Sequence, residues 1–123
     1  MMDLHESGEM YLETILMLKN KNEYVRSIDV ANALNYSKPS VSRAMKILKE
    51  SQFVVIDNKG YIDFTQEGKR IAEGVYNRHI TLTDFLISIG VENGQAENDA
   101  CRIEHIISEE TYQCIKEFMK KQS

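Results

Sequence analysis

The chain has 123 residues, of which 42% are hydrophobic and 28% are charged, an ordinary composition for a soluble protein of one or two small domains. It has no apolar stretch near the ~20 residues of a membrane span, and its N-terminus lacks the basic segment and apolar core of a signal peptide, so we expect a cytoplasmic protein with no membrane partner. The net charge of −4 argues against nucleic-acid binding only until its distribution is considered, because the surplus acid lies in residues 71–123 and residues 1–70 are neutral.

The hydrophobic pattern predicts a mainly α chain with one β-hairpin. In chain order it predicts helices over residues 4–20, 28–34 and 38–51, hairpin strands over 53–56 and 61–64, and helices over 66–89, 95–107 and 109–121. The predicted N-caps are Ser27, Ser37, Thr65 and Ser108, whose hydroxyl oxygens suit the unpaired N–H groups of a first turn. Residues 93–94, Asn-Gly, read as a turn before the fifth helix.

The order helix, turn, helix, hairpin over residues 1–70 predicts a winged helix-turn-helix DNA-binding domain, followed by a helical domain over residues 71–123. Residues 36–60 carry a local charge of +3, which suits a phosphate backbone. On the predicted recognition helix the polar residues lie opposite the apolar stripe, and Arg43 suits a bidentate contact with guanine. The DNA-contacting candidates are Ser37, Pro39, Ser40, Ser42, Arg43, Lys46, Lys49 and, on the hairpin tip, Lys59. A merely solvated helix face is the alternative.

Donor groups for a metal ion occur in three predicted helices. Cys101, Glu104 and His105 are spaced i, i+3, i+4, which places them within an arc of about 100° on a helix. Further donors are Met10, Glu13 and His79. Taken singly, each has a structural alternative: core filling for the methionine and cysteine, a surface acid, and a hydrogen-bonded histidine. The mixed sulfur, carboxylate and imidazole set suits Fe(II), Co(II), Ni(II) or Zn(II) better than Mn(II).

The chain resembles the diphtheria toxin repressor family of metal-dependent bacterial repressors, which includes the manganese transport regulators. The resemblance rests on the segments 9–12 (Glu-Met-Tyr-Leu), 37–42 (Ser-Lys-Pro-Ser-Val-Ser), 65–68 (Thr-Gln-Glu-Gly) and 99–105 (Asp-Ala-Cys-Arg-Ile-Glu-His). It implies a principal metal site of Met10, Cys101, Glu104 and His105, as in iron-responsive members. It also implies a second site with Glu13 and His79.

Two departures from the family pattern bear on the second site. Iron-type members have an acid where Thr83 stands and a histidine where Glu97 stands, so Glu97 is a candidate substitute ligand. The chain ends at Ser123, and from this we expect a short form without the SH3-like domain of longer members.

We therefore expect a metal-activated, homodimeric transcriptional repressor that binds palindromic operators of metal-uptake genes and takes no small-molecule substrate. In the mechanism that the resemblance implies, metal ties the first helix to the dimer lobe and so sets the spacing of two recognition helices. Fe(II) is the expected metal, with Mn(II), Co(II), Ni(II) and Zn(II) as alternatives. The other interpretations are a manganese-responsive member of the same family and a thiol-based redox regulator that uses Cys101. Enzyme motifs such as His-Glu-x-x-His are absent, so we do not expect an enzyme.

Overall fold

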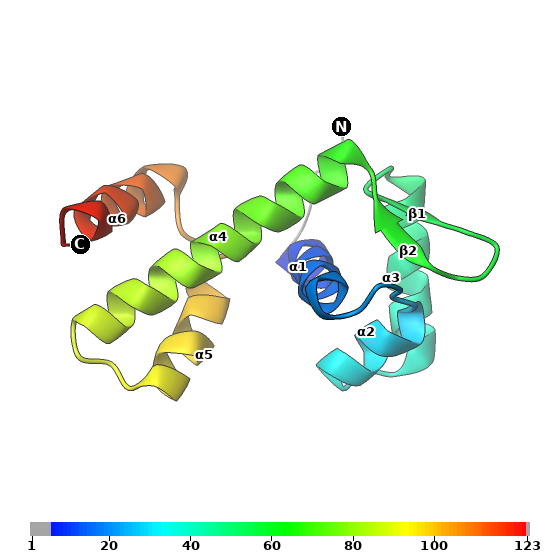
Figure 1. Ribbon diagram of the computed structural model, residues 1–123, viewed down its shortest axis with the longest axis horizontal. Coiled ribbons are helices and arrows are strands. Elements are labelled where there is room, and N and C mark those ends of the chain that lie inside the picture. Colours follow the sequence, from blue (N-terminus) through cyan, green and yellow to red (C-terminus); the bar gives the residue numbers. More distant parts are fainter. Residues whose placement is uncertain (1–5, 123) are drawn as a thin grey trace. The chain divides into compact units, whose positions relative to one another are not determined.

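The computed structural model describes residues 6–122, and the chain divides into two compact units between Glu73 and Gly74. Its elements are α1 (Glu6–Lys21), α2 (Ser27–Leu34), α3 (Lys38–Glu50), β1 (Val54–Ile56), β2 (Ile62–Phe64), α4 (Gln66–Ser88), α5 (Asn93–Ile103) and α6 (Glu109–Gln122) (Figure 1). The order confirms the predicted fold class, a winged helix-turn-helix followed by a helical unit. The predicted helix start at residue 4 lies outside the described residues.

The first unit is built on an apolar core shared by three helices and the hairpin. Helices α1, α2 and α3 contact one another, and α3 also contacts β1 (Figure 1). The side chains that fill this core include Leu12, Ile15, Val30, Val41, Met45, Leu48, Phe53, Val54 and Ile62, all buried. The three from α3 recur at i, i+4 and i+7, the spacing of one helix face. Burying each large aliphatic side chain contributes about 1.5–3 kcal/mol, so this core fixes how α3 is presented.

The N-terminus of α3 is capped as the sequence predicts. Ser37 Oγ accepts a hydrogen bond from the Ser40 N–H at 3.3 Å, and Pro39 stands in the first turn, where a missing N–H costs nothing. The preceding helix, α2, ends at Leu34, and its C-cap Asn35 takes the left-handed conformation with φ 58°. The turn into α3 is therefore fixed by local backbone chemistry on both sides.

The predicted cap of α2 is wrong by one residue. Arg26 is the N-cap and Ser27 is the first helical residue. The Arg26 N–H donates to the Asp29 carboxylate at 2.8 Å, so a side chain three residues into the helix satisfies the entering backbone. An acid at the third helical position therefore replaces the expected hydroxyl cap.

The hairpin is locked to the start of α4. Strands β1 and β2 are antiparallel, with Val54 opposite Phe64. Thr65 Oγ1 accepts from the Gly68 N–H at 3.1 Å, as a predicted N-cap should, and donates to the Gln52 carbonyl at 2.7 Å. A Cβ at Gly68 would overlap the carbonyl oxygen of Phe53. Only glycine allows this close approach of helix and strand.

The second unit consists of α4 from Gly74 onward, α5 and α6. Helix α5 begins at Asn93, with Glu92 as its N-cap, so residues 93–94 are its first turn and not the predicted separate turn. The Gly94 and Gln95 N–H groups donate to the Glu92 carboxylate and hold its pKa below the usual value. Helix α6 is capped by Ser108 as predicted, since Ser108 Oγ accepts from the Thr111 N–H at 3.1 Å. Between residues 6 and 122 no helix has the length and apolarity needed to cross a bilayer.

Candidate metal centre and nucleic-acid interface

A buried acid in the second unit lies beside two histidines. Glu104, just after α5, is fully buried, at 0% exposure. Its Oε1 is 3.3 Å from Nδ1 of His79 on α4 and 3.8 Å from Nε2 of His105. The side chains of these two histidines are also largely shielded from solvent, being 19% and 2% exposed. The structure therefore brings together three of the predicted metal ligands within one unit.

Glu104 lacks the hydrogen bonds that a buried carboxylate normally has. Within residues 6–122 neither of its oxygens accepts a hydrogen bond. Removing an ionised carboxylate from water costs several kcal/mol unless a positive charge compensates it. A metal cation and a protonated imidazole are the two groups that would supply that charge here. Carboxylate and imidazole together are a donor set that divalent transition metals accept, so these residues fit such an ion.

The hydroxyl of Thr83 lies one helical turn beyond His79 on α4. Its Oγ1 is buried and has no hydrogen-bond partner among the described residues. The resemblance stated above singles out this position, because iron-type members of that family carry an acid where Thr83 stands. Besides the two Glu104 oxygens, an oxygen without a hydrogen bond among the described residues thus occurs on α4, the helix of His79.

Of the three residues in the predicted helical arc, Cys101 lies within α5, whereas Glu104 and His105 follow the end of that helix. Helix α5 ends at Ile103, so Glu104 is its C-cap and His105 lies in the following turn. Glu104 keeps helical dihedral angles and its N–H donates to the Ala100 carbonyl, which preserves part of the expected spacing. Cys101, within the helix, is exposed. The helix ends earlier than predicted because the chain turns at residues 104–107 to enter α6.

The remaining predicted ligands lie on α1 and on α5. Met10 is partly buried, and its Sδ accepts a hydrogen bond from the Tyr36 hydroxyl at 3.9 Å. Glu13 is buried, at 6% exposure. Glu97, the candidate substitute ligand, is exposed on α5. The contact between Met10 and Tyr36 links a predicted ligand to the residue just before the cap of α3.

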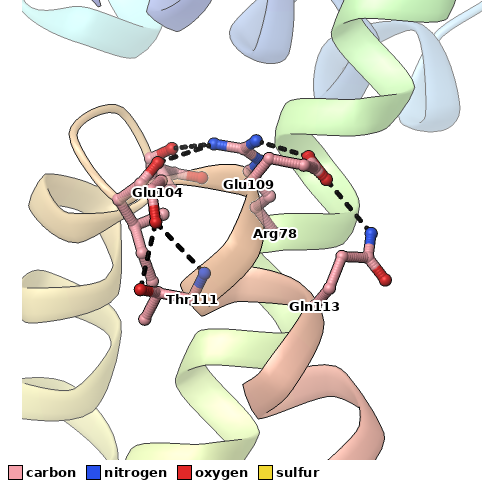
Figure 2. Close-up of polar contacts among 7 residues, drawn as sticks. Arg78, Glu104, Glu109, Thr111 and Gln113 are labelled. Carbon is pink, nitrogen blue, oxygen red and sulfur yellow. Dashed lines mark hydrogen bonds and ion pairs between the residues drawn. The ribbon is translucent and has the colours of Figure 1, made fainter.

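Sequence reasoning did not assign a role to Arg78. Figure 2 shows its guanidinium next to the turn between α5 and α6 and to the first residues of α6. Nη1 donates to the carbonyls of Glu104 and Ile107, both at 3.3 Å, and Nη2 contacts the Glu109 carboxylate at 2.8 Å. A pattern in the sequence does point to it, because Ile71, Val75, residue 78 and Leu82 follow the i, i+4, i+7, i+11 spacing of one helix face. A charged residue in an apolar stripe needs internal partners.

The predicted DNA-contacting residues lie on the surface of the first unit. Exposed side chains are those of Ser37, Pro39, Ser42, Arg43, Lys46, Lys49 and Lys59, and Ser40 is half-buried. Ser37 Oγ donates to Ser40 Oγ at 2.8 Å, and Arg43 Nη2 donates to the same Ser40 oxygen at 3.3 Å. This chain of hydroxyls orients Arg43 along the exposed face of α3. Lys59 stands in the hairpin turn, where the Asp57 carboxylate accepts its N–H at 2.9 Å.

A basic side chain from the N-cap of α2, to which sequence reasoning assigned no role, contacts the hairpin. Arg26 lies over the Tyr61 ring, 4.7 Å from its centroid, and Nη2 donates to the Tyr61 hydroxyl at 3.3 Å. Tyr61 in turn stacks on Tyr24 with 4.5 Å between centroids. The position of Arg26 in the sequence, next to the predicted cap Ser27, gave no indication of this contact. The partner, Tyr61, lies far along the chain in the hairpin.

Comparison with known proteins covers both units. Residues 3–63 match the family model of the iron dependent repressor N-terminal DNA binding domain, and residues 65–123 match that of the iron dependent repressor metal binding and dimerisation domain. An uncharacterised HTH-type transcriptional regulator of Methanocaldococcus jannaschii is 30% identical over 120 residues, covering 96% of each chain.

Two solved structures show the same fold. The IdeR structure of T. acidophilum superposes with a TM-score of 0.79 at 27% identity, over 91% of this chain and 53% of that one. A manganese-dependent transcriptional repressor in complex with manganese superposes with a TM-score of 0.85 at 23% identity, over 92% of this chain and 52% of that one. The chain thus spans about half the length of both solved relatives.

Proposed function

The chain belongs to the iron-dependent repressor family, and from this premise we propose that it is a metal-activated, homodimeric transcriptional repressor of metal-uptake genes. Members of this family bind DNA through the N-terminal domain and dimerise through the C-terminal one, and they are regulators rather than enzymes. The observation that carries the proposal for this chain is the fully buried Glu104 carboxylate, which accepts no hydrogen bond from the described residues and lies 3.3 Å from His79 and 3.8 Å from His105.

In this proposal His79, Glu104 and His105 hold the ion within the second unit. When bound, the ion supplies the positive charge that the buried carboxylate requires. Met10, Glu13 and Cys101 are the further ligands that the sequence predicts, and Glu97 is the substitute predicted for the second site. Loss of metal affinity on replacing each residue singly tests these assignments.

Fe(II) is the metal we propose, because Met10 and Cys101 offer sulfur donors. Mn(II), Co(II), Ni(II) and Zn(II) are the competing ions, and the two histidines and Glu104 suit any of them. The sulfur positions therefore decide the preference. Replacing both with carboxylates, Met10→Asp with Cys101→Glu, should shift the response toward Mn(II) relative to Fe(II) or Co(II).

Two single variants complete the test of metal choice. Cys101→Ala should weaken activation by every metal, because it removes a charged ligand. Met10→Leu keeps volume and apolarity, so a methionine that only fills space predicts wild-type behaviour. An unchanged metal ranking in the double variant, together with wild-type behaviour of Met10→Leu, would leave the iron assignment without support.

The DNA-binding part of the proposal places the N-terminal half of α3 in the major groove of a palindromic operator, with the hairpin beside it. The exposed and oriented Arg43 suits a guanine contact, and the lysines of α3 and of the hairpin turn suit phosphates. A homodimer would present two such helices to the two half-sites.

Operator titrations with Fe(II), Mn(II), Zn(II) and chelator in parallel test the function as a whole. We expect metal to raise operator affinity about 5- to 150-fold, the usual range of coupling between two sites. The ion achieves this only by binding the DNA-competent form more tightly than the other form. Equal operator affinity in metal and in chelator would refute metal activation.

A thiol-based redox regulator is the second candidate function, and the exposed thiol of Cys101 is the observation that favours it. In that case peroxide changes operator affinity in chelator, and Fe(II) added anaerobically changes nothing. Cys101→Ser would abolish the peroxide response. For a metal-activated repressor we expect that peroxide leaves operator affinity in chelator unchanged and that anaerobic Fe(II) raises it.

A further inference from the structure

Arg78 holds the segment that carries two of the proposed ligands. This segment, the α5–α6 turn, comprises residues 104–107. Arg78 donates through one nitrogen to the first and last carbonyls of that turn, those of Glu104 and Ile107 (Figure 2). Both carbonyls follow the C-terminal end of α5, where backbone oxygens lack intrahelical partners and attract positive charge. The guanidinium therefore closes the turn by binding both of its ends.

The Arg78 guanidinium is itself held in place from α6. Its Nη2 lies 2.8 Å from Glu109 Oε1, and the other oxygen of Glu109 accepts from the Gln113 amide at 3.1 Å. The Tyr112 ring lies 5.2 Å from the guanidinium carbon. The hydrogen bond from Gln113 and the adjacent Arg78 keep the pKa of the Glu109 carboxyl below its usual value. This carboxylate therefore stays charged at neutral pH and keeps Arg78 oriented.

Glu104 is consequently fixed at two points by successive residues of α4. Arg78 binds its backbone carbonyl, and His79 Nδ1 lies 3.3 Å from its carboxylate oxygen. The first contact places the Glu104 backbone from which the carboxylate extends. The second places the carboxylate itself. Because His105 is the next residue in the same clamped turn, its imidazole position depends on the same guanidinium.

We propose that Arg78 is a positioning residue for the metal centre, which sets the geometry of Glu104 and His105 through their backbone without itself binding the ion. This inference rests on the proposed function. An arginine is needed because its planar fork reaches acceptors in several directions, whereas a lysine ammonium offers one nitrogen. Partners that orient metal ligands in this way typically change metal affinity 10- to 100-fold when they are removed.

The test uses the full chain and Co(II) as the probe, with affinity measured by chelator competition and geometry by the visible absorption of bound Co(II). Arg78→Met should weaken Co(II) binding at least about tenfold and alter the absorption bands. Arg78→Lys should fall between Arg78→Met and wild type. Glu109→Gln, which removes the charge that orients the guanidinium, should give a smaller loss in the same direction.

Two control variants separate positioning from simple stabilisation. Arg70→Met removes another α4 arginine, whose partner is Glu67, and should leave Co(II) affinity and spectrum unchanged. Ala96→Gly, at a buried position of α5, lowers stability in chelator by about 1 kcal/mol and should leave the spectrum of the bound ion unchanged.

The outcomes distinguish the two proposals. Wild-type protein that binds no Co(II) would overturn the proposed function, and the positioning role with it. Wild-type protein that binds Co(II), with Arg78→Met and Arg78→Lys binding equally tightly and giving the same spectrum, would overturn the positioning role alone. If Arg78→Met does not fold, Arg78→Lys and Glu109→Gln decide the question by the same two measurements.

Discussion

The two units differ in how large an apolar core accompanies a buried acid. The core of the first consists of aliphatic and aromatic residues from three helices, the hairpin and the start of α4, and Glu13 is also buried in this unit, at 6% exposure. The second unit buries fewer large apolar side chains, and its Glu104 is fully buried, at 0% exposure, beside His79 and His105. Apolar burial stabilises a unit with or without a metal ion, whereas a buried carboxylate needs a compensating charge. In this comparison the larger apolar core of the first unit holds α3 at its surface, and the second unit holds the acid that the proposed ion would balance.

The largest effect we expect is in the first unit, at the contact between the hairpin and α4. Gly68→Ala places a methyl group against the Phe53 carbonyl, and we expect a loss of about 3 kcal/mol in the free energy of unfolding. Urea unfolding followed by circular dichroism measures it. Gly74→Ala is the matched control, because a Cβ there meets no atom within 4 Å. Alanine is the better helix former by about 1 kcal/mol, so Gly74→Ala should not lower stability. A loss of similar size in both variants would show that the close approach to Phe53 does not decide the result.

Glu104→Gln tests the role of the buried acid in the second unit. With metal at 100 times Kd, wild-type protein should gain about 2.7 kcal/mol of stability, and the variant should gain almost none. In chelator the variant should be at least as stable as wild type, because the amide keeps the shape and removes an uncompensated charge. Thermal unfolding with and without metal gives both values, and Glu110→Gln, an exposed acid on α6, is the control. A variant destabilised in chelator would mean that a protonated histidine already balances this carboxylate.

Substitutions on α3 should affect DNA binding and spare the metal response. Arg43→Ala should cost about 1–3 kcal/mol on the cognate operator and relax its specificity. Lys46→Ala should weaken binding to all sequences and reduce the salt slope by about 1. Operator binding measured at several salt concentrations separates the two effects. Equal, sequence-independent losses would reduce Arg43 to a phosphate contact.

The smallest effect among the predicted losses is at the cap of α3. Ser37→Ala removes the acceptor of the Ser40 N–H and should lower stability by about 1 kcal/mol. Ser42→Ala changes an exposed hydroxyl on the same helix and should leave stability within about 0.5 kcal/mol of wild type. Urea unfolding of both variants measures the difference. Indistinguishable stabilities would mean that Pro39 and the core hold this turn without the cap.

The features that the sequence predicted well are those set by local chemistry. The apolar spacing of α3, the Ser37, Thr65 and Ser108 caps and the hairpin all follow from neighbouring residues. At the starts of α2 and α5 the prediction failed because a carboxylate makes the cap. The side chain of Asp29 serves the N-terminus of α2, and Glu92 begins α5 two residues earlier than expected.

The candidate metal centre was predictable in its residue types and less so in its geometry. The spacing of Glu104 and His105 identified them, but their place in a turn after α5 depends on Arg78, which is distant in sequence. No pattern around Cys101 distinguished an exposed position from a buried one. Contacts between α4 and the α5–α6 turn join residues that are distant in sequence. The sign of them in the sequence is Arg78, a charged residue within the apolar stripe of α4.

Helix α4 belongs to both units, since the chain divides at Gly74 within it. Glycine is the weakest helix former apart from proline, by about 1 kcal/mol relative to alanine, and a Cβ at this position would meet nothing. Unwinding of α4 that begins in one unit should therefore end at Gly74. The helical turns in the other unit then stay intact. Amide hydrogen exchange along α4 should then show two protection levels that meet at Gly74, and Gly74→Ala should merge them by making opening of the helix more cooperative.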